Sequence, residues 1–367
     1  MGEPAPWFHA PCVGGHPRFA FDTMAGRFVL MLFYGTAERD ICQQAFRDLA
    51  QHRALFDDQK ACFFGITVEK SDVTEGRVSS SMPGIRHLLD EDRDVSRRFG
   101  VMFPSSKGEV HRPCWMLPDE GLRVIEYRPI TESEAIFARL KALIAEEASL
   151  PAPVLMIPRV FEPDLCETLI NVYNAGDAYD SGYMIEREGK TIGVVNHSFK
   201  RRTDCSVDDP ALRDRIRDCL AASVIPMIKR AYQFDVTRVE RWIVARYDGE
   251  VGGFFNRHRD NTTAGTAHRK FACTINLNGD FDGGGVAFPE FGSQIYRPPP
   301  GGAVIFSCSL LHEAMPVTRG LRYAFLPFFY DEAGADLRIA NNEKLGENVK
   351  PYLAPRDVAE EEAEATA

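Results

Sequence analysis

The first third of the chain alternates between continuous apolar runs and segments with helical spacing. Phe28–Gly35 (FVLMLFYG) and 61–68 (ACFFGITV) are unbroken apolar runs, which are typical of strands buried on both faces. Residues 38–56 lie between them and place apolar side chains at helical spacing. Further elements are predicted as a helix at 95–99, strands at 114–117 and 124–127, and an amphipathic helix at 131–147 that opens with a capping box from Thr131 to Glu134. This order predicts an α/β domain with a central sheet covered by helices.

The pattern changes after residues 149–153 (SLPAP), a proline-rich stretch that predicts a domain boundary. Helices are predicted at 163–175 and 209–233. Short strands separated by turns rich in glycine and proline follow, at 239–247, 271–278, 285–289, 303–307 and 323–330. This spacing predicts an α+β domain with a double-sheet jelly-roll core. We therefore expect domains at 1–150 and 151–335, and a carboxyl-terminal extension with an acidic tail at 336–367.

Composition and charge restrict the class of protein. The 367 residues suffice for two domains, and the formal net charge of −10 comes from 43 basic and 53 acidic residues. An acidic chain is not expected to bind nucleic acid. The apolar runs are too short to span a membrane, and the start lacks the basic and apolar regions of a secretion signal. Nine scattered cysteines without a CxxC pair favour reduced thiols, so we expect a soluble cytoplasmic protein without membrane partners.

A set of potential metal ligands lies in the second half. His258 and Asp260 are two residues apart, so both side chains project to one face of an extended segment. His312 follows the predicted strand at 303–307. Two imidazoles and one carboxylate form the facial triad of non-haem Fe(II) oxygenases, which leaves positions open for a co-substrate and O2. Arg322 opens the last strand, where its guanidinium can bind a dicarboxylic co-substrate. His268, beside Arg269 and Lys270, is expected in a solvated loop.

Residues from about 152 to 332 resemble the 2-oxoglutarate/Fe(II)-dependent dioxygenases of the prolyl 4-hydroxylase-like branch. The motifs that carry the resemblance are ARYDG at 245–249, HRDN at 258–261, TINLN at 274–278, FDGGGVAFP at 281–289, PGGAVIF at 300–306 and HEAMPVTRGLR at 312–322. The resemblance implies His258, Asp260 and His312 as Fe(II) ligands. It implies that Arg322 holds the distal carboxylate of 2-oxoglutarate, with a hydrogen bond from Tyr247 to the same co-substrate.

The same resemblance implies an activity. Decarboxylation of 2-oxoglutarate to succinate, with O2 as the oxidant, would be coupled to hydroxylation of a second substrate. Because Asp260 stands where a halogenase has glycine or alanine, the resemblance favours a hydroxylase. Family members act on peptides, proteins, free amino acids and small metabolites, so the substrate stays open, with proline among the candidates.

Residues 2–130 resemble the peroxiredoxin family, which has a thioredoxin-like fold. The resemblance rests on GEPAP at 2–6, the apolar run FVLMLFY at 28–34, FGITV at 64–68, LLDEDRDVSRRFGV at 88–101 and RPCWMLPDEG at 112–121. It places Cys42 at the peroxidatic position and Arg112 at that of the arginine that stabilises the thiolate. Near a helix start and a cation, the pKa of Cys42 is expected to be lowered. Gly35 and Arg39 replace the family proline and threonine, which favours a retained fold over an active peroxidase.

Two other functions remain open. The alternatives to a hydroxylase are a thiol peroxidase that uses Cys42 and a non-catalytic binding protein built on a redoxin scaffold. Residues 176–205 are expected to form an irregular insertion that acts as a lid. Within it, Lys200, Arg201 and Arg202 either attract an acidic substrate or form a solvated surface. A homodimer is a further expectation, because both folds tend to expose edge strands.

Overall fold

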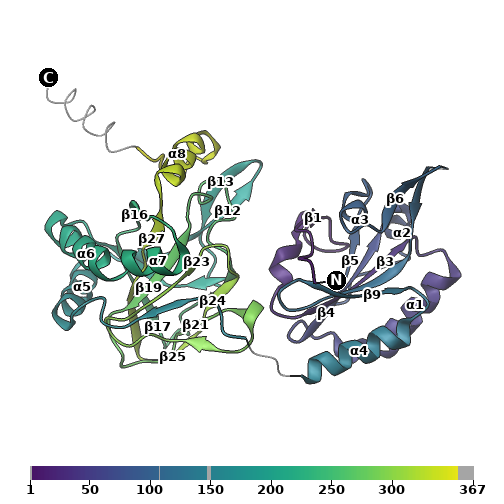
Figure 1. Cartoon of the computed structure of the whole chain (residues 1–367), viewed down its shortest axis with the longest axis horizontal. Coiled ribbons are helices and arrows are strands. Elements are labelled where there is room, and N and C mark those ends of the chain that lie inside the picture. Colours follow the sequence, from purple (N-terminus) through teal and green to yellow (C-terminus); the bar gives the residue numbers. More distant parts are fainter. Residues whose placement is uncertain (1, 107, 147–149, 354–367) are drawn as a thin grey trace. The chain divides into compact units, whose positions relative to one another are not determined.

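The computed structural model describes residues 2–106, 108–146 and 150–353, so residues 354–367 of the predicted carboxyl-terminal extension lie outside the described residues. The chain divides into two compact units (Figure 1). The first consists of Met1–Ala152 with Phe288–Gln294, and the second of Pro153–Ala287 with Ile295–Ala367. None of the described helices combines the length and the apolar character that crossing a membrane requires.

The first unit is built on a five-stranded mixed sheet. In spatial order its strands are β5 (Ile85–Leu89), β4 (Ala61–Thr67), β3 (Phe28–Gly35), β8 (Cys114–Pro118) and β9 (Val124–Pro129). The first three are parallel, and β8 and β9 are antiparallel to their neighbours. Every residue of β3 and β4 is buried, because the sheet is covered on both faces.

Helices and small ribbons cover this sheet. Alternate residues of β3 point to opposite faces: Leu30 and Leu32 enter a core with α1 (Asp40–Gln51) and α4 (Ser133–Ala145), whereas Phe33 contacts Phe99 on the other face. The smaller elements are β1 (His9–Ala10), β2 (Phe19–Ala20), α2 (Lys70–Thr74), α3 (Asp94–Arg98), β6 (Met102–Ser105) and β7 (Gly108–His111). The predicted capping box is wrong, because α4 starts after Glu132 without a side-chain cap.

The second unit contains two facing β-sheets, the jelly-roll arrangement. The larger sheet consists of β10 (Leu155–Ile157), β23 (Ala303–Ser307), β19 (Phe271–Asn276), β26 (Leu321–Phe325), β17 (Ile243–Asp248), β15 (Thr203–Ser206) and β11 (Tyr179–Asp180), with β16 (Arg238–Glu240) and β27 (Phe328–Tyr330) attached through β19. The smaller sheet consists of β14 (Lys200–Arg201), β18 (Phe254–His258), β24 (His312–Ala314), β21 (Val286–Ala287) and β22 (Ile295–Tyr296). A further small ribbon pairs β20 (Asp282–Gly283) with β25 (Val317–Arg319). The predicted fold class is confirmed for both parts of the chain.

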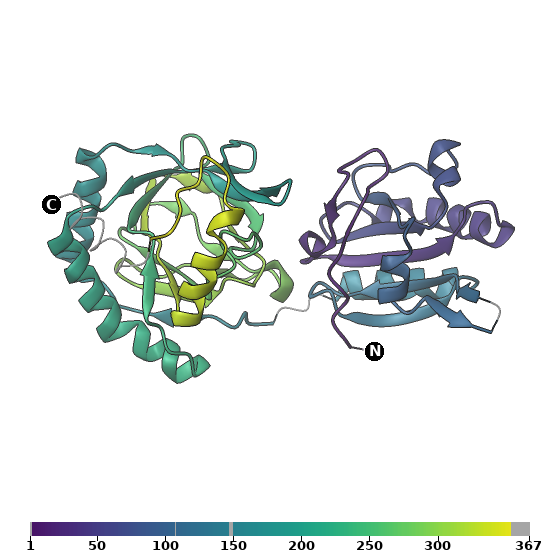
Figure 2. The same ribbon diagram turned by 90° about the horizontal axis from the view of Figure 1, so that it is seen from above.

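Helices cover the outer face of the larger sheet (Figure 2). They are α5 (Pro163–Ala175), α6 (Pro210–Ser223) and α7 (Ile225–Tyr232), and α8 (Glu332–Ala340) follows the last strand. Leu169 and Ile216 share a buried core with Val244 of the sheet. The helix predicted at 209–233 is two helices, because Pro226 cannot donate the backbone hydrogen bond that continuity requires.

Residues 176–205 are not irregular, which corrects the prediction. They contain β11, β14, β15 and a hairpin of β12 (Tyr183–Arg187) and β13 (Lys190–Val194). Glu188 and Gly189 both have positive φ angles, 53° and 74°, which is the geometry of a tight hairpin turn. Residues near the carboxyl end pack on this hairpin: the Gly346 amide donates to the Thr191 carbonyl (2.8 Å) and Asn348 Nδ2 donates to the Gly193 carbonyl (2.7 Å).

Candidate metal centre

His258 and His312 face each other across the smaller sheet. They are register partners in the antiparallel pair β18–β24, and their ring centroids are 4.3 Å apart. Asp260 follows β18, where its amide donates to the Cys308 carbonyl at 3.0 Å. Its carboxylate reaches both rings, with Oδ1 3.5 Å from His258 Nε2 and Oδ2 3.3 Å from His312 Nε2. One donor atom from each of the three residues lies within 4.8 Å of the other two.

The protonation of these groups suits metal binding. Burial and the neighbouring His312 lower the pKa of His258 to about 4, so its imidazole is neutral at physiological pH. Burial alone would raise the pKa of Asp260, but both histidines outweigh this effect and hold the pKa well below its ordinary value. Two imidazoles and one carboxylate on one side of a pocket are the donor set that suits non-haem Fe(II). The donors present therefore fit the metal that the sequence indicates.

Arg322 lies in the same pocket and has no acidic partner among the described residues. Only 1% of this residue is exposed. Its Nε donates to Asn276 Oδ1 (3.0 Å) and its Nη2 to Thr274 Oγ1 (2.9 Å), both of which are neutral acceptors. Burial accordingly lowers the pKa of the guanidinium. An unpaired buried charge is costly, so this position favours a ligand that brings a carboxylate.

Tyr247 stands between Arg322 and a second arginine. The Arg322 Cζ atom lies 5.0 Å from the centre of the Tyr247 ring, and the Tyr247 hydroxyl accepts from Arg202 Nη1 at 3.3 Å. Arg202 is buried and forms a two-pronged pair with Asp204, Nε to Oδ1 at 2.7 Å and Nη2 to Oδ2 at 2.8 Å. Burial opposes ionisation of Asp204, but Arg202 and Arg241 lower its pKa to about 2. This pair fixes the position of Arg202 beside Tyr247.

One pocket in the second unit is lined by all five residues that the sequence singles out there: His258, Asp260, His312, Arg322 and Tyr247. Arg202, Arg241 and Thr274 line it as well, and sequence reasoning assigned no role to the last two. The sequence does contain a signal that Thr274 and Asn276 lie near Arg322. They are alternate residues of β19, so they face the same side of the sheet, and β19 pairs with the strand β26 that contains Arg322.

The solvated environments expected for His268 and for part of the run at 200–202 are wrong. His268 is not in a solvated loop: it is 1% exposed, and its Nε2 lies 3.1 Å from Glu240 Oε2, so it is a structural histidine away from the triad. Lys200 and Arg202 are buried, and only Arg201 of the run is exposed. Lys200 Nζ donates to the Gly182 carbonyl at 2.6 Å, so this run is part of the fold.

Cys42 does not have the expected lowered pKa. It is the third residue of α1 and is 0% exposed, and its Sγ donates to the Tyr34 carbonyl at 3.4 Å. Burial raises the pKa of the thiol, which outweighs the lowering by Arg39. Arg112 is exposed and lies against the Phe103 ring, with Cζ 5.0 Å from its centre.

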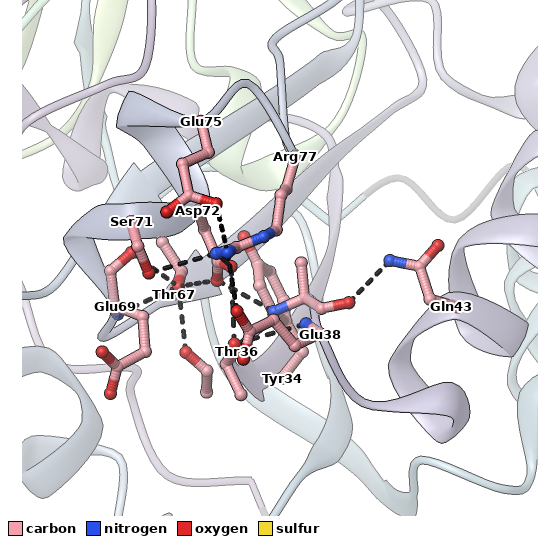
Figure 3. A network of polar contacts seen from close by, with 12 residues as sticks. Tyr34, Thr36, Glu38, Gln43, Thr67, Glu69, Ser71, Asp72, Glu75 and Arg77 are labelled. Atoms are coloured by element: carbon pink, nitrogen blue, oxygen red, sulfur yellow. Dashed lines mark hydrogen bonds and ion pairs between the residues drawn. The ribbon is translucent and has the colours of Figure 1, made fainter.

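A polar network occupies the end of β3 that leads to Cys42 (Figure 3). At its centre is the fully buried Asp72, which accepts from the Ala37 amide at 2.8 Å and the Thr67 hydroxyl at 2.6 Å. Arg77 pairs with Asp72 at 3.2 Å and with Glu38 at 2.6 Å. The loop before α1 is therefore held by internal contacts.

Comparisons with known proteins agree with the resemblance found for each half of the chain. Residues 242–330 match the family model of the 2OG-Fe(II) oxygenase superfamily, and residues 1–126 match that of the AhpC/TSA family. A PKHD-type hydroxylase of Verminephrobacter eiseniae is 31% identical over 127 residues, which cover 31% of this chain and 55% of the relative. One of Polaromonas sp. is 34% identical over 99 residues, covering 24% and 42%. The chain thus spans about half or less of the curated relatives that it matches.

Solved structures resemble each unit separately. A prolyl hydroxylase of Trichoplax adhaerens, in complex with a hypoxia inducible factor peptide fragment, is 18% identical with a TM-score of 0.40 and covers 50% of this chain and 86% of its own. Peroxiredoxin Q of Xanthomonas campestris is 16% identical with a TM-score of 0.31, covering 37% and 91%. Both resemblances found in the sequence are confirmed by the family models.

Proposed function

We propose that this protein is a hydroxylase. Its chain matches the 2OG-Fe(II) oxygenase superfamily after a match to the AhpC/TSA family. It would couple conversion of 2-oxoglutarate and O2 to succinate and CO2 with hydroxylation of a second substrate. The observation that carries the proposal is the buried Arg322, which has no acidic partner among the described residues and lines one pocket with His258, Asp260 and His312.

Each residue has a role in this proposal. His258, Asp260 and His312 would hold Fe(II), which supplies the capacity to activate O2 for attack on an unactivated C–H bond. Arg322 would bind the distal carboxylate of 2-oxoglutarate, and its bonds to Asn276 and Thr274 orient the guanidinium before the ligand arrives. The Tyr247 hydroxyl is engaged by Arg202, so we assign it the positioning of Arg322 and a secondary contact to the co-substrate.

Apolar side chains would protect the reaction from water. Phe255 stacks on the His258 ring at a centroid distance of 3.5 Å, and Phe306 packs against His312 at 4.6 Å. These rings fix the orientation of both imidazoles and limit the solvent beside the metal.

The substrate class is proposed from the relatives. PKHD-type hydroxylases and a prolyl hydroxylase are among the similar proteins, which supports a peptidyl or free amino acid substrate with proline as the first candidate.

All nine cysteines are free thiols, which supports a cytoplasmic location. A homodimer remains a prediction.

The test is succinate release by the full-length protein with Fe(II), 2-oxoglutarate and O2, across a panel of proline peptides and amino acids, with products identified by mass. We expect iron-dependent succinate formation that is abolished in His258→Ala and Asp260→Ala. Failure of the iron-loaded protein to bind 2-oxoglutarate would refute the proposal. The thiol-peroxidase alternative is disfavoured, because Cys42 is buried with a raised pKa.

A further inference from the structure

Arg241 places a second available cation in the metal pocket. It lies between β16 and β17, where its φ angle of 68° interrupts the strand that the sequence predicts at 239–247. Residues other than glycine rarely adopt this conformation. The break turns the chain between Glu240, which is bonded to His268, and the β17 strand that carries Tyr247. Arg241 lines the pocket that contains His258, Asp260 and His312.

The charge of Arg241 is only partly compensated. Within the described part of the chain its guanidinium makes one hydrogen bond, from Nη2 to Asp204 Oδ2 at 3.2 Å. The same carboxylate already receives two hydrogen bonds from Arg202 and one from the Ser181 hydroxyl. The remaining donors of Arg241 are therefore available, and 27% of its side chain is exposed.

The charge balance of the pocket favours a negatively charged guest. Among the described lining residues, three guanidinium groups (Arg202, Arg241 and Arg322) stand against the single carboxylate of Asp260. The charge of Arg202 is compensated by its ion pair with Asp204, which does not line the pocket. Fe(II) and the 2-oxoglutarate dianion carry equal and opposite charges, so loading the site leaves one positive charge, and Arg241 is the group that carries it.

We propose that Arg241 binds a carboxylate of the substrate to be hydroxylated, and thus determines specificity for acidic substrates. The inference rests on the proposed function and names the substrate class of that site. Phe328 lies beside this cation, with Arg241 Cζ 5.4 Å from its ring centre, so a carboxylate would be held next to an apolar surface. The carboxylate belongs either to a free amino acid or to an acidic side chain near the hydroxylated residue of a peptide.

The experiment measures binding by calorimetry to the full-length protein loaded with 2-oxoglutarate and with Mn(II), which replaces the reactive iron. The probes are matched pairs: L-proline and L-leucine against their amides, and a proline-containing pentapeptide with glutamate against the same peptide with glutamine. Arg241→Gln removes the charge and Arg241→Lys retains it. Arg238→Gln is the control, because Arg238 is paired with Glu332 at 2.8 Å and does not line the pocket.

We expect at least one carboxylate probe to bind roughly tenfold or more tightly than its neutral partner. Arg241→Gln should abolish this preference and Arg241→Lys should keep part of it. Arg238→Gln should keep it all and leave 2-oxoglutarate affinity unchanged. The amino acid and peptide pairs separate the two sources of carboxylate. Equal binding within every pair, or a preference that survives Arg241→Gln, overturns the assignment of Arg241. If the protein still binds 2-oxoglutarate in that case, the proposed function stands. Loss of 2-oxoglutarate binding in the unaltered protein overturns both.

Discussion

His258 and His312 are held by the same local device on two paired strands. The Nδ1 atom of each ring faces the backbone carbonyl two residues earlier in the chain, Asn256 O at 2.7 Å and Leu310 O at 3.0 Å. A carbonyl can only accept, so each Nδ1 carries a proton, and Nε2 is the nitrogen of each ring that is left to bind a metal. Both imidazoles are therefore preset in the tautomer that a metal requires.

Replacement of either histidine should remove the metal. His258→Gln or His312→Gln is expected to weaken Fe(II) or Mn(II) binding by roughly 100-fold or more, because each removes a direct ligand. Calorimetric titration of the apoprotein measures this change. His268→Gln is the control, since His268 is also a buried histidine but is bonded to Glu240. We expect the control to lose stability and keep its metal affinity, and an equal loss of affinity in all three variants would contradict the assignment.

Arg322→Gln should weaken binding of 2-oxoglutarate by roughly 10- to 100-fold, the usual value of a charge-assisted hydrogen bond to a carboxylate. Arg322→Lys should recover part of the affinity. Arg319→Gln serves as the control, because Arg319 is exposed and paired with Asp282 at 2.6 Å. Titration of the metal-loaded protein with 2-oxoglutarate measures the effect, and unchanged affinity in Arg322→Gln would exclude it as the anchor.

Cys42 should be unreactive in the folded protein. Its thiol is fully buried and its pKa is raised, whereas Cys12 and Cys219 are only partly buried. Brief alkylation followed by peptide mass analysis should label Cys12 and Cys219 first, and Cys42 only after unfolding. Cys42→Ser should leave peroxide consumption unchanged. Early labelling of Cys42, or peroxide consumption that disappears with it, would restore the peroxidase hypothesis.

The first unit should lose stability in mild acid through His87. Burial lowers the pKa of His87 to about 4, from an ordinary value near 6.5. The unfolded chain therefore binds this proton first as the pH falls from about 6.5 to 4, so stability decreases over this window, by up to about 3 kcal/mol. Hydrogen exchange of β3 and β4 at several pH values measures the change in the intact chain.

The matched variant is His87→Gln, which removes the titration and keeps a polar group near the Tyr34 hydroxyl, 3.2 Å from His87 Nδ1. Its stability should depend less on pH than that of the unaltered protein. Equal pH dependence of the two proteins would show that another group dominates, such as His111, whose pKa burial also lowers to about 4.

The sequence predicts what depends on local pattern and misses what depends on distant partners. Alternation along an extended segment predicts that His258, the last residue of β18, and Asp260, two residues further on, can reach one metal ion. An unbroken apolar run likewise predicts cover on both faces, as β3 has. The burial of His268 could not be predicted, because its partner Glu240 lies 28 positions earlier. The raised pKa of Cys42 could not be predicted either. The spacing from Phe33 indicates where the thiol lies in the fold, but not that burial removes the water around it.

The packing of the hairpin β12–β13 is completed only when residues 346–348 have been synthesised. The hairpin β12–β13 leaves the ribosome early, yet the Asn348 that bonds Gly193 follows 155 residues later. The family match ends at residue 330, before this contact. Until residues 346–348 emerge, the nascent hairpin lacks these two contacts, so a late segment of the chain completes one of the earliest elements of the oxygenase half.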